Sequence, residues 1–193
     1  MSYPQVSFEL PGWIEDLVSE NGEVYPTREE RMRLAIELSR LNTERGTGGP
    51  FGAAIFESES GRLLAPGVNL VTTANLSTAH AEMVAIMVAQ QALGSFDLGE
   101  ERLPAYELVA STEPCAMCFG ATPWSGVRGL VCGGRDEDAR SIGFDEGPKM
   151  SDWPSALRER GISVERDVLR EEAAAVLRGY AESGGVIYNA CQG

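Results

Sequence analysis

Two short stretches decide how this chain is interpreted: His80-Ala81-Glu82 and Pro114-Cys115-Ala116-Met117-Cys118. They supply one imidazole and two thiols, which are side chains that zinc prefers, and His80 is the only histidine of the sequence. Three protein ligands leave the fourth tetrahedral position open, as is typical of a catalytic zinc site. The spacing therefore predicts Zn²⁺ held by His80, Cys115 and Cys118.

Glu82 is a carboxylate that the metal does not need as a ligand, because the three side chains above already form a catalytic donor set. Water bound to such a zinc ion has its pKa lowered toward about 7. Glu82 is placed to move protons between that water and a leaving group. A Cys-x-x-Cys pair is also typical of a redox motif or of half of a structural zinc site, and both alternatives stay open at this point.

The length and composition indicate one soluble globular domain. The 193 residues are 43% hydrophobic and 23% charged, and no apolar run approaches the roughly 18 residues of a membrane span. The first residues lack the basic and apolar regions of a signal peptide. Two further cysteines remain: Cys132, expected to be a buried core thiol, and Cys191, for which the sequence indicates no role. This cysteine usage predicts a cytoplasmic protein with no membrane association.

The charge balance argues against a nucleic-acid partner. The net charge is −13, from 29 acidic and 16 basic residues, and Lys149 is the only lysine. The arginines are scattered rather than gathered into the basic patch that a phosphate backbone requires. We therefore expect a small-molecule substrate.

Hydrophobic periodicity and turn residues predict a single α/β domain, with an N-terminal extension of about 1–26 and a C-terminal tail of about 184–193. Thr27 and Glu30 form a capping box at the first predicted helix. Strands that alternate with helices predict a sandwich around one sheet. The predicted helices cover 27–41, 79–93, 115–124, 136–142, 151–160 and 169–182, and the predicted strands cover 51–57, 63–70, 106–110, 129–132 and 162–164.

The metal ligands fall at the starts of two predicted helices. Cys115 and Cys118 are three residues apart, so both sulfur atoms face the same way on one helical turn. The partial positive charge of a helix N-terminus lowers thiol pKa values and favours the thiolates that zinc binds. His80 begins the other helix, and the two helix starts placed side by side would hold the metal between them.

These residues and their flanks resemble the cytidine deaminase-like superfamily of zinc-dependent deaminases over about 48–147. The zinc motif is shared by cytosine, cytidine, guanine and tRNA-adenosine deaminases, so it indicates the reaction type alone. Within the superfamily the chain is most similar to the guanine deaminases, because of the later segment 143–146. The pieces that carry the resemblance are Gly49-Pro50-Phe51-Gly52-Ala53, Asn69-Leu70-Val71-Thr72-Thr73-Ala74-Asn75, Thr78-Ala79-His80-Ala81-Glu82, Thr112-Glu113-Pro114-Cys115-Ala116-Met117-Cys118-Phe119-Gly120-Ala121 and Gly143-Phe144-Asp145-Glu146.

The resemblance implies a three-layer α/β/α sandwich with a mixed five-stranded sheet, a homodimer, and a C-terminal segment that closes over the chain's own pocket or that of the partner. It implies that Asn69 reads the purine edge and that Phe51 and Trp124 lie near the base. It also implies that Glu146, where guanine deaminases usually have Asp, contacts the substrate and helps to protonate the leaving ammonia. The remaining substrate contacts expected are Ala81, Phe144 and Tyr188.

Each of these assignments has a plain structural alternative. Asn69 is also typical of a turn, and Phe51 and Trp124 are equally consistent with core positions. For Glu146 the pocket role is favoured over that of a solvated surface acid, whereas Tyr188 is equally consistent with packing of the tail.

The sequence thus predicts a zinc-dependent hydrolase that converts guanine to xanthine and ammonia, with Glu82 delivering the proton. The alternatives are a deaminase of cytosine or of an aminotriazine such as ammeline, a tRNA adenosine deaminase, and a catalytically silent zinc-binding domain. Glu82 argues against a silent domain, because a structural metal site does not need an unligated acid beside it.

Overall fold

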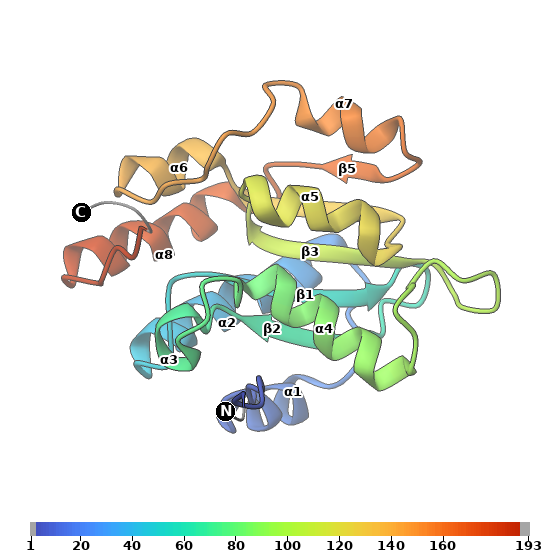
Figure 1. Ribbon diagram of the computed structural model, residues 1–193, viewed down its shortest axis with the longest axis horizontal. Helices are drawn as coiled ribbons and strands as arrows, with labels where there is room; N and C mark the ends of the chain where they lie inside the picture. Colours follow the sequence, from blue (N-terminus) through green and yellow to red (C-terminus); the bar gives the residue numbers. More distant parts are fainter. Residues whose placement is uncertain (1–2, 190–193) are drawn as a thin grey trace.

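The computed structural model describes residues 3–189, and it is built around one mixed sheet (Figure 1). The strand order is β2-β1-β3-β4-β5; β1 is antiparallel to both β2 and β3, whereas β3, β4 and β5 run parallel. The mixed five-stranded sheet is therefore confirmed. The strands are β1 Gly52–Glu57, β2 Leu63–Val68, β3 Tyr106–Thr112, β4 Gly129–Gly134 and β5 Ser163–Glu165.

Helices cover both faces of the sheet and complete the predicted sandwich. α2 and α8 pack on one face, and α4, α5 and α7 lie on the other (Figure 1). Among residues 3–189 no helix has both the length and the apolar character that a bilayer crossing requires. The helices are α1 Trp13–Asn21, α2 Arg28–Glu44, α3 Val71–Ala74, α4 Ala81–Leu93, α5 Ala116–Ser125, α6 Asp136–Ser141, α7 Trp153–Arg158 and α8 Arg170–Glu182.

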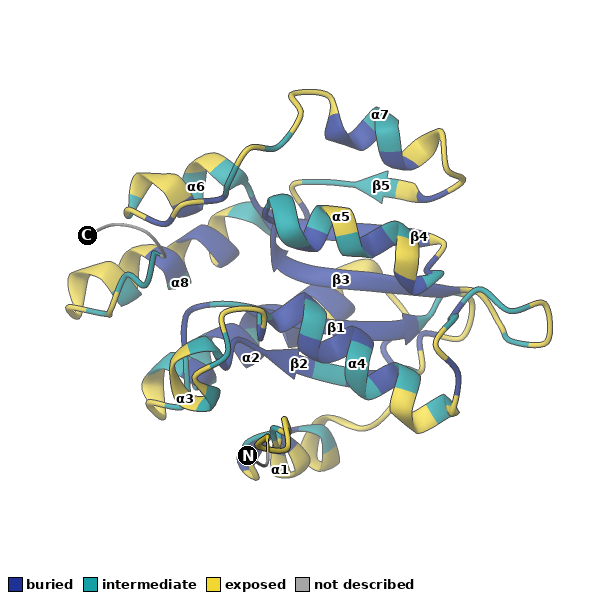
Figure 2. Ribbon diagram, in the orientation of Figure 1, coloured by how far each residue is buried: buried dark blue, intermediate teal, exposed yellow. Residues whose placement is uncertain are grey.

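The three inner strands β1, β3 and β4 are buried on both faces, which explains their largely apolar sequences (Figure 2). Successive side chains of a strand point to opposite faces. In β1, Ala54 and Phe56 accordingly join the core beneath α2, while Ala53 and Ile55 join the core beneath α4. The sheet is thus a rigid platform for the segments at its edge.

The first long helix begins where the capping box predicted. The side-chain oxygen of Thr27 accepts a hydrogen bond from the backbone N–H of Glu30 at 3.2 Å, and the carboxylate of Glu30 accepts one from the N–H of Thr27 at 2.8 Å. These bonds satisfy donors that a helix start leaves without partners.

The N-terminal extension contains a helix, α1, that the sequence did not predict. Trp13, Ile14 and Leu17 of α1 are buried in the same cluster as Met32 of α2. The indole Nε1 of Trp13 also donates a hydrogen bond to Thr47 at 3.3 Å. Helix α1 of the extension is therefore packed into the core on the α2 face.

Candidate active site

The site lies at the sheet edge where β1 begins and where β2 and β3 end. The register pairs Gly52 of β1 with Val68 of β2, and Ala53 of β1 with Ala110 of β3. Segments that leave these three strands therefore start close together, and ligand sites commonly form just outside such strand ends.

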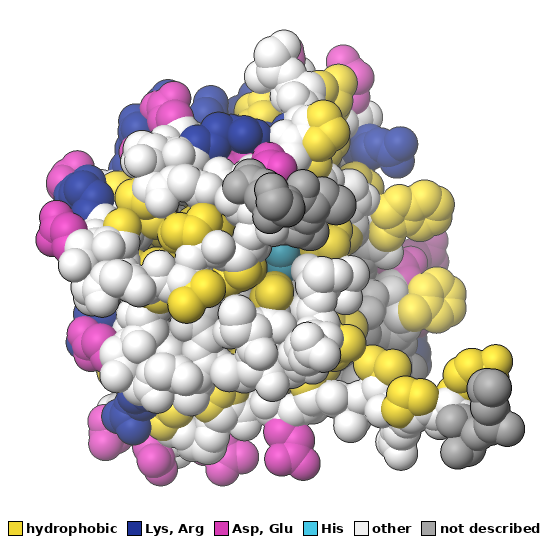
Figure 3. Space-filling model, turned by 60° about the vertical axis from the view of Figure 1, so that its left-hand side comes forward, with side chains coloured by type: hydrophobic (Ala, Val, Ile, Leu, Met, Phe, Trp, Pro, Cys, Tyr) yellow, Lys and Arg dark blue, Asp and Glu magenta, His cyan; other side chains and the backbone are white. Residues whose placement is uncertain are grey.

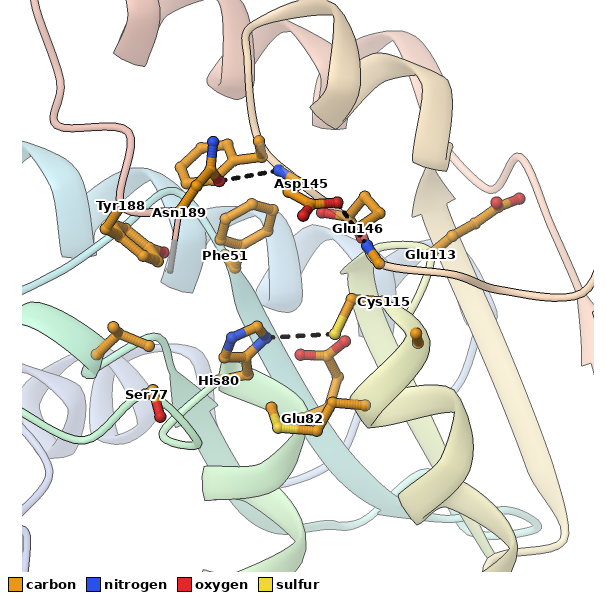
Figure 4. A pocket seen from close by; sticks show the side chains of 15 residues that line it. Phe51, Ser77, His80, Glu82, Glu113, Cys115, Asp145, Glu146, Tyr188 and Asn189 are labelled. Carbon is orange, nitrogen blue, oxygen red and sulfur yellow. Dashed lines mark hydrogen bonds between the residues drawn. The ribbon is translucent and has the colours of Figure 1, made fainter. Parts of the chain in front are cut away.

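The three predicted metal ligands come together at two helix starts. His80 precedes the first residue of α4, and Cys115 precedes the first residue of α5, with Cys118 in the first turn. Their ligand atoms all lie within 4.8 Å of one another, and Cys115 Sγ is 3.5 Å from His80 Nδ1 (Figure 4). Neither His80 nor Cys115 uses its side chain to cap its helix, so both are free for a metal. One imidazole and two sulfurs at this separation fit the donor set of a catalytic zinc.

The two thiols are coupled through a hydrogen bond. The hydrogen bond from Cys118 lowers the pKa of the Cys115 thiol to about 4 and raises the pKa of Cys118. Burial lowers the pKa of His80, but the hydrogen bond with Cys115 and the negative charges of Glu82, Cys115 and Glu146 together outweigh it, so the pKa of His80 is raised. Protons that these groups hold in the metal-free protein are released when a cation binds.

Glu82 lies in the first turn of α4, buried beside the ligands and facing the cavity (Figure 4). Burial, followed by the negative charge of Cys115, raises the pKa of Glu82 to about 7. A carboxyl whose pKa is close to neutral both accepts and returns a proton under ordinary conditions, as a general acid–base requires.

A cavity of about 530 Å³ opens above the ligands, within the usual size of small-molecule sites. The single histidine of the chain is visible at the bottom of the hollow in Figure 3, with apolar side chains around it. The cavity is lined by Phe51, Val71, Ser77, His80, Glu82, Glu113, Cys115, Ala116, Met117, Phe144, Asp145, Glu146, Gly147, Tyr188 and Asn189.

Glu146 is on the opposite side of the cavity from α4. Its carbonyl accepts a hydrogen bond from the N–H of Ala116 at 2.9 Å, which fixes this loop over the start of α5. The residue is buried, and burial, with the charges of Cys115 and Glu82, raises the pKa of Glu146 to about 8. The plain alternative of a solvated surface acid is therefore wrong.

Aromatic rings form one wall of the cavity, and one of these rings, Tyr188, belongs to the C-terminal tail. Phe144 makes edge contacts with Phe51 and Tyr188, with ring centroids 5.0 and 5.1 Å apart. Burial raises the pKa of the Tyr188 phenol, and its oxygen is buried without a hydrogen-bond partner. The tail therefore lies against the chain's own pocket up to Asn189; Cys191 is outside the described residues.

The structure corrects two of the expected substrate contacts. Trp124 is 86% exposed on the outer side of α5 and does not line the cavity. Its position on the helix, six residues after Cys118, turns it away from the sheet. Ala81 is buried in the core between α4 and the sheet rather than in the cavity wall. Phe51, Phe144 and Tyr188 do line the cavity.

Asn69 takes a position just behind the wall. Its backbone N–H donates to the carbonyl of Phe51 at 3.1 Å, and its Oδ1 accepts from the N–H of Val71 at 3.2 Å. Both of these neighbours line the cavity. The Nδ2 of Asn69 is buried and has no partner, so it is available as a donor.

Sequence reasoning missed Asn189, which connects the tail to the Glu146 loop. Its Nδ2 donates to the carbonyl of Gly143 at 2.8 Å, and its Oδ1 accepts from the N–H of Asp145 at 2.9 Å. No motif surrounds Asn189 in the sequence, and only its neighbour Tyr188 hinted that the tail is buried. Val71, Ser77, Glu113 and Met117 were also missed as wall residues.

Known proteins are similar to this chain in sequence and in fold. The family model described as the cytidine and deoxycytidylate deaminase zinc-binding region matches residues 26–134. A guanine deaminase from Bacillus subtilis is 35% identical over 140 residues, which are 72% of this chain and 85% of that protein. A tRNA-specific adenosine deaminase from Agrobacterium fabrum is 31% identical over 147 residues, 76% of this chain and 89% of that protein.

The likeness to a solved structure extends over nearly the whole chain. The structure of a guanine deaminase from Nitrosomonas europaea is 44% identical with a TM-score of 0.86, and the match covers 94% of this chain and 100% of that one. This coverage includes segments on both sides of the region that the family model matches.

Proposed function

The chain belongs to the cytidine and deoxycytidylate deaminase family with its zinc-binding region, and we propose that it hydrolyses guanine to xanthine and ammonia. The observation that carries this proposal is the near-complete match to the guanine deaminase of Nitrosomonas europaea. The buried acid Glu146 above the metal ligands supports it from the site itself.

The protein groups divide the chemistry between them. His80, Cys115 and Cys118 would hold zinc, which would supply a Lewis acid that lowers the pKa of water to about 7. Glu82, with its pKa of about 7, takes a proton and passes it to the substrate ring. Glu146, with its pKa of about 8, is protonated at neutral pH and delivers a proton to the departing ammonia; it recovers a proton from the carbon-bound hydroxyl as the product carbonyl forms.

The remaining wall suits a flat aromatic base. Phe51, Phe144 and Tyr188 offer ring surfaces, and a purine enclosed by them is desolvated on its faces. The unpartnered Nδ2 of Asn69 is a donor for an acceptor atom on the purine edge. Leaving such a buried donor without a partner costs free energy, so bases that lack the matching acceptor are disfavoured.

A tRNA adenosine deaminase is the main alternative, supported by the relative from Agrobacterium fabrum. That match covers 76% of this chain at 31% identity, compared with 94% at 44% for the guanine deaminase. The net charge of −13 also opposes binding to a polyanion.

Ammonia release from a panel of bases tests the proposal directly. Guanine, cytosine, adenine, cytidine, guanosine and ammeline are compared at equal concentration with zinc-loaded protein. We expect kcat/KM for guanine to exceed that for every other compound. A higher value for cytosine or ammeline would reassign the substrate. Inactivity on the whole panel would contradict the proposal and favour a tRNA anticodon loop as the substrate.

The same site architecture is proposed to operate in a cytoplasmic homodimer. Apart from the buried Glu82, α4 and α5 contain no Asp, Glu, Lys or Arg, although the chain as a whole is strongly acidic. A helix pair without surface charge is typical of a buried layer, and here Trp124 and Phe96 are each 86% exposed.

The cytoplasmic location is supported by the cysteines. Cys115, Cys118 and Cys132 are all free thiols, consistent with a reducing compartment.

A further inference from the structure

One side-chain amide behind the pocket ties two of its walls together. Asn42, near the end of α2, is fully buried and does not line the cavity. Its Nδ2 donates one hydrogen bond to the carbonyl of Gly49 and one to the carbonyl of Asn69, each at 2.9 Å. Both N–H groups of this amide therefore donate hydrogen bonds, one to the segment that precedes β1 and one to the segment that follows β2.

Each of the two carbonyls belongs to a residue just behind the wall. Asn69 carries the unpartnered Nδ2 assigned above to the purine edge. Gly49 lies directly against the tail, because a methyl group added at Gly49 would be only 2.2 Å from the Tyr188 oxygen. A shift of the Asn42 amide would thus displace both the base-reading residue and the surface on which Tyr188 rests.

The amide is itself oriented from the N-terminal helix. Thr47 Oγ1 donates to Asn42 Oδ1 at 2.7 Å, which leaves Nδ2 turned toward the two carbonyls. Thr47 Oγ1 in turn accepts the hydrogen bond from Trp13 Nε1 at 3.3 Å. Trp13 is the first residue of α1, so a continuous chain of hydrogen bonds runs from α1 to the pocket.

We propose that Asn42 is a positioning residue for base recognition and tail closure, and that α1 holds it in place through Trp13 and Thr47. The inference rests on the proposed function, which assigns Asn69 and Tyr188 to the substrate. Asn42 touches neither the substrate space nor the metal ligands, so its influence passes through Asn69 and Gly49.

A merely structural role makes a different prediction. Buried carbonyls need donors, and Asn42 satisfies two of them whatever the pocket does. Loss of such bonds lowers the melting temperature in either case. Only a positioning role raises KM for the base while kcat and zinc content stay close to those of the wild type.

The test replaces Thr47 rather than Asn42, so that the buried amide stays in place. Thr47→Val keeps the shape and removes the hydroxyl that orients the amide. Thr43→Val is the matched control, because Thr43 lies close by on α2, is similarly half-buried, and donates only to the carbonyl of Arg40 at 2.7 Å. Thr47→Ser restores the hydroxyl.

We expect Thr47→Val to raise KM for guanine about three- to tenfold, the worth of one oriented hydrogen bond, with kcat within about twofold. Thr43→Val and Thr47→Ser should resemble the wild type. An equal KM in Thr47→Val and Thr43→Val, or no recovery in Thr47→Ser, would overturn the proposal.

A second measurement does not depend on guanine as substrate. Chymotrypsin cleavage after Tyr188 is followed by mass spectrometry well below the melting temperatures of the variants. If the hydrogen bonds through Thr47 and Asn42 hold the tail against the pocket, Thr47→Val is cleaved at least about threefold faster than Thr43→Val. Equal cleavage rates overturn the proposal even if the wild-type enzyme acts on another base, whereas inactivity on guanine with unequal rates overturns only the proposed function.

Discussion

The floor and the roof of the pocket are built in different ways. The floor, comprising His80, Glu82, Cys115 and Cys118, comes from the first turns of two helices that rest on the sheet. The roof, residues 143–147 and 186–189, consists of loop and tail segments joined by side-chain hydrogen bonds. The floor is a local feature of two short stretches, whereas the roof exists only when distant parts of the chain meet.

This difference separates the chemistry from the choice of substrate. Metal ligands and a proton carrier must keep fixed mutual distances, which a helix backed by a sheet provides. Recognition and closure over a substrate require segments that can open, and loops and termini supply these more readily. Changes in the floor should therefore abolish the reaction, and changes in the roof should weaken it by smaller factors.

The largest effect is expected from the double substitution Cys115→Ala/Cys118→Ala. Removing two of three ligands should lower the zinc content from about one per chain to nearly zero and reduce activity to background. Metal analysis of the purified protein checks this. Cys132→Ala, which removes a buried thiol of β4, is the control and should keep its zinc. Full zinc retention in the double variant would show that the metal is held elsewhere.

Glu82→Gln should retain zinc and lose the reaction. The amide is nearly the same shape but does not carry a proton at neutral pH, so kcat should fall by about 10²–10⁴-fold. Steady-state kinetics and metal analysis on the same sample measure both quantities. Glu101→Gln, at an exposed residue, should leave both unchanged. Activity of Glu82→Gln within about tenfold of the wild type would assign proton transfer to another group.

Glu146→Gln extends the comparison to the roof and should lower kcat by about a hundredfold. Burial is the main cause of the raised pKa of Glu146, about 8, so the proton is present at neutral pH and lost above that value. Wild-type kcat should therefore decrease as pH rises through about 8, and this decrease should be absent in Glu146→Gln. A pH profile of the same shape in both proteins would remove Glu146 from proton delivery.

Tyr188→Ala should have a moderate effect, because it removes one aromatic contact of the roof and leaves the floor intact. An edge contact of this kind is worth about 1 kcal/mol, so kcat/KM for guanine should fall roughly fivefold with zinc content unchanged. Truncation after Gly185 should cost at least as much. Val186→Ala, at a residue that is 64% exposed, is the control. Full activity of the truncated protein would show that the tail does not close the site.

The same contrast explains how much the sequence revealed. The ligands were found because Cys115 and Cys118 are one helical turn apart, and the strands because their apolar runs are bounded by turn residues. Helix α1 was missed because a nine-residue helix is marginal alone and is stabilised here by packing of Trp13, Ile14 and Leu17. Asn189 and the outward direction of Trp124 depend on tertiary packing, which spacing along the chain does not encode.

The smallest effect on chemistry is expected from Trp124→Ser, which tests the outer face of the floor helices. Since Trp124 is 86% exposed and outside the cavity, kcat/KM for guanine should stay within about twofold of the wild type at high protein concentration. The proposed homodimer should instead dissociate more readily, because an exposed aromatic residue on an uncharged face commonly contributes much of the association energy.

Sedimentation velocity over a range of concentrations measures the monomer–dimer equilibrium of Trp124→Ser. Val24→Ser is the matched control, since Val24 is an exposed apolar residue outside α4 and α5. A dimer that is weakened in Trp124→Ser alone places the interface on α4 and α5. A tenfold loss of kcat/KM at every concentration, with the dimer intact, would mean that Trp124 reaches the base of the partner's pocket after all. The floor helices would then contribute to substrate recognition as well as to metal binding.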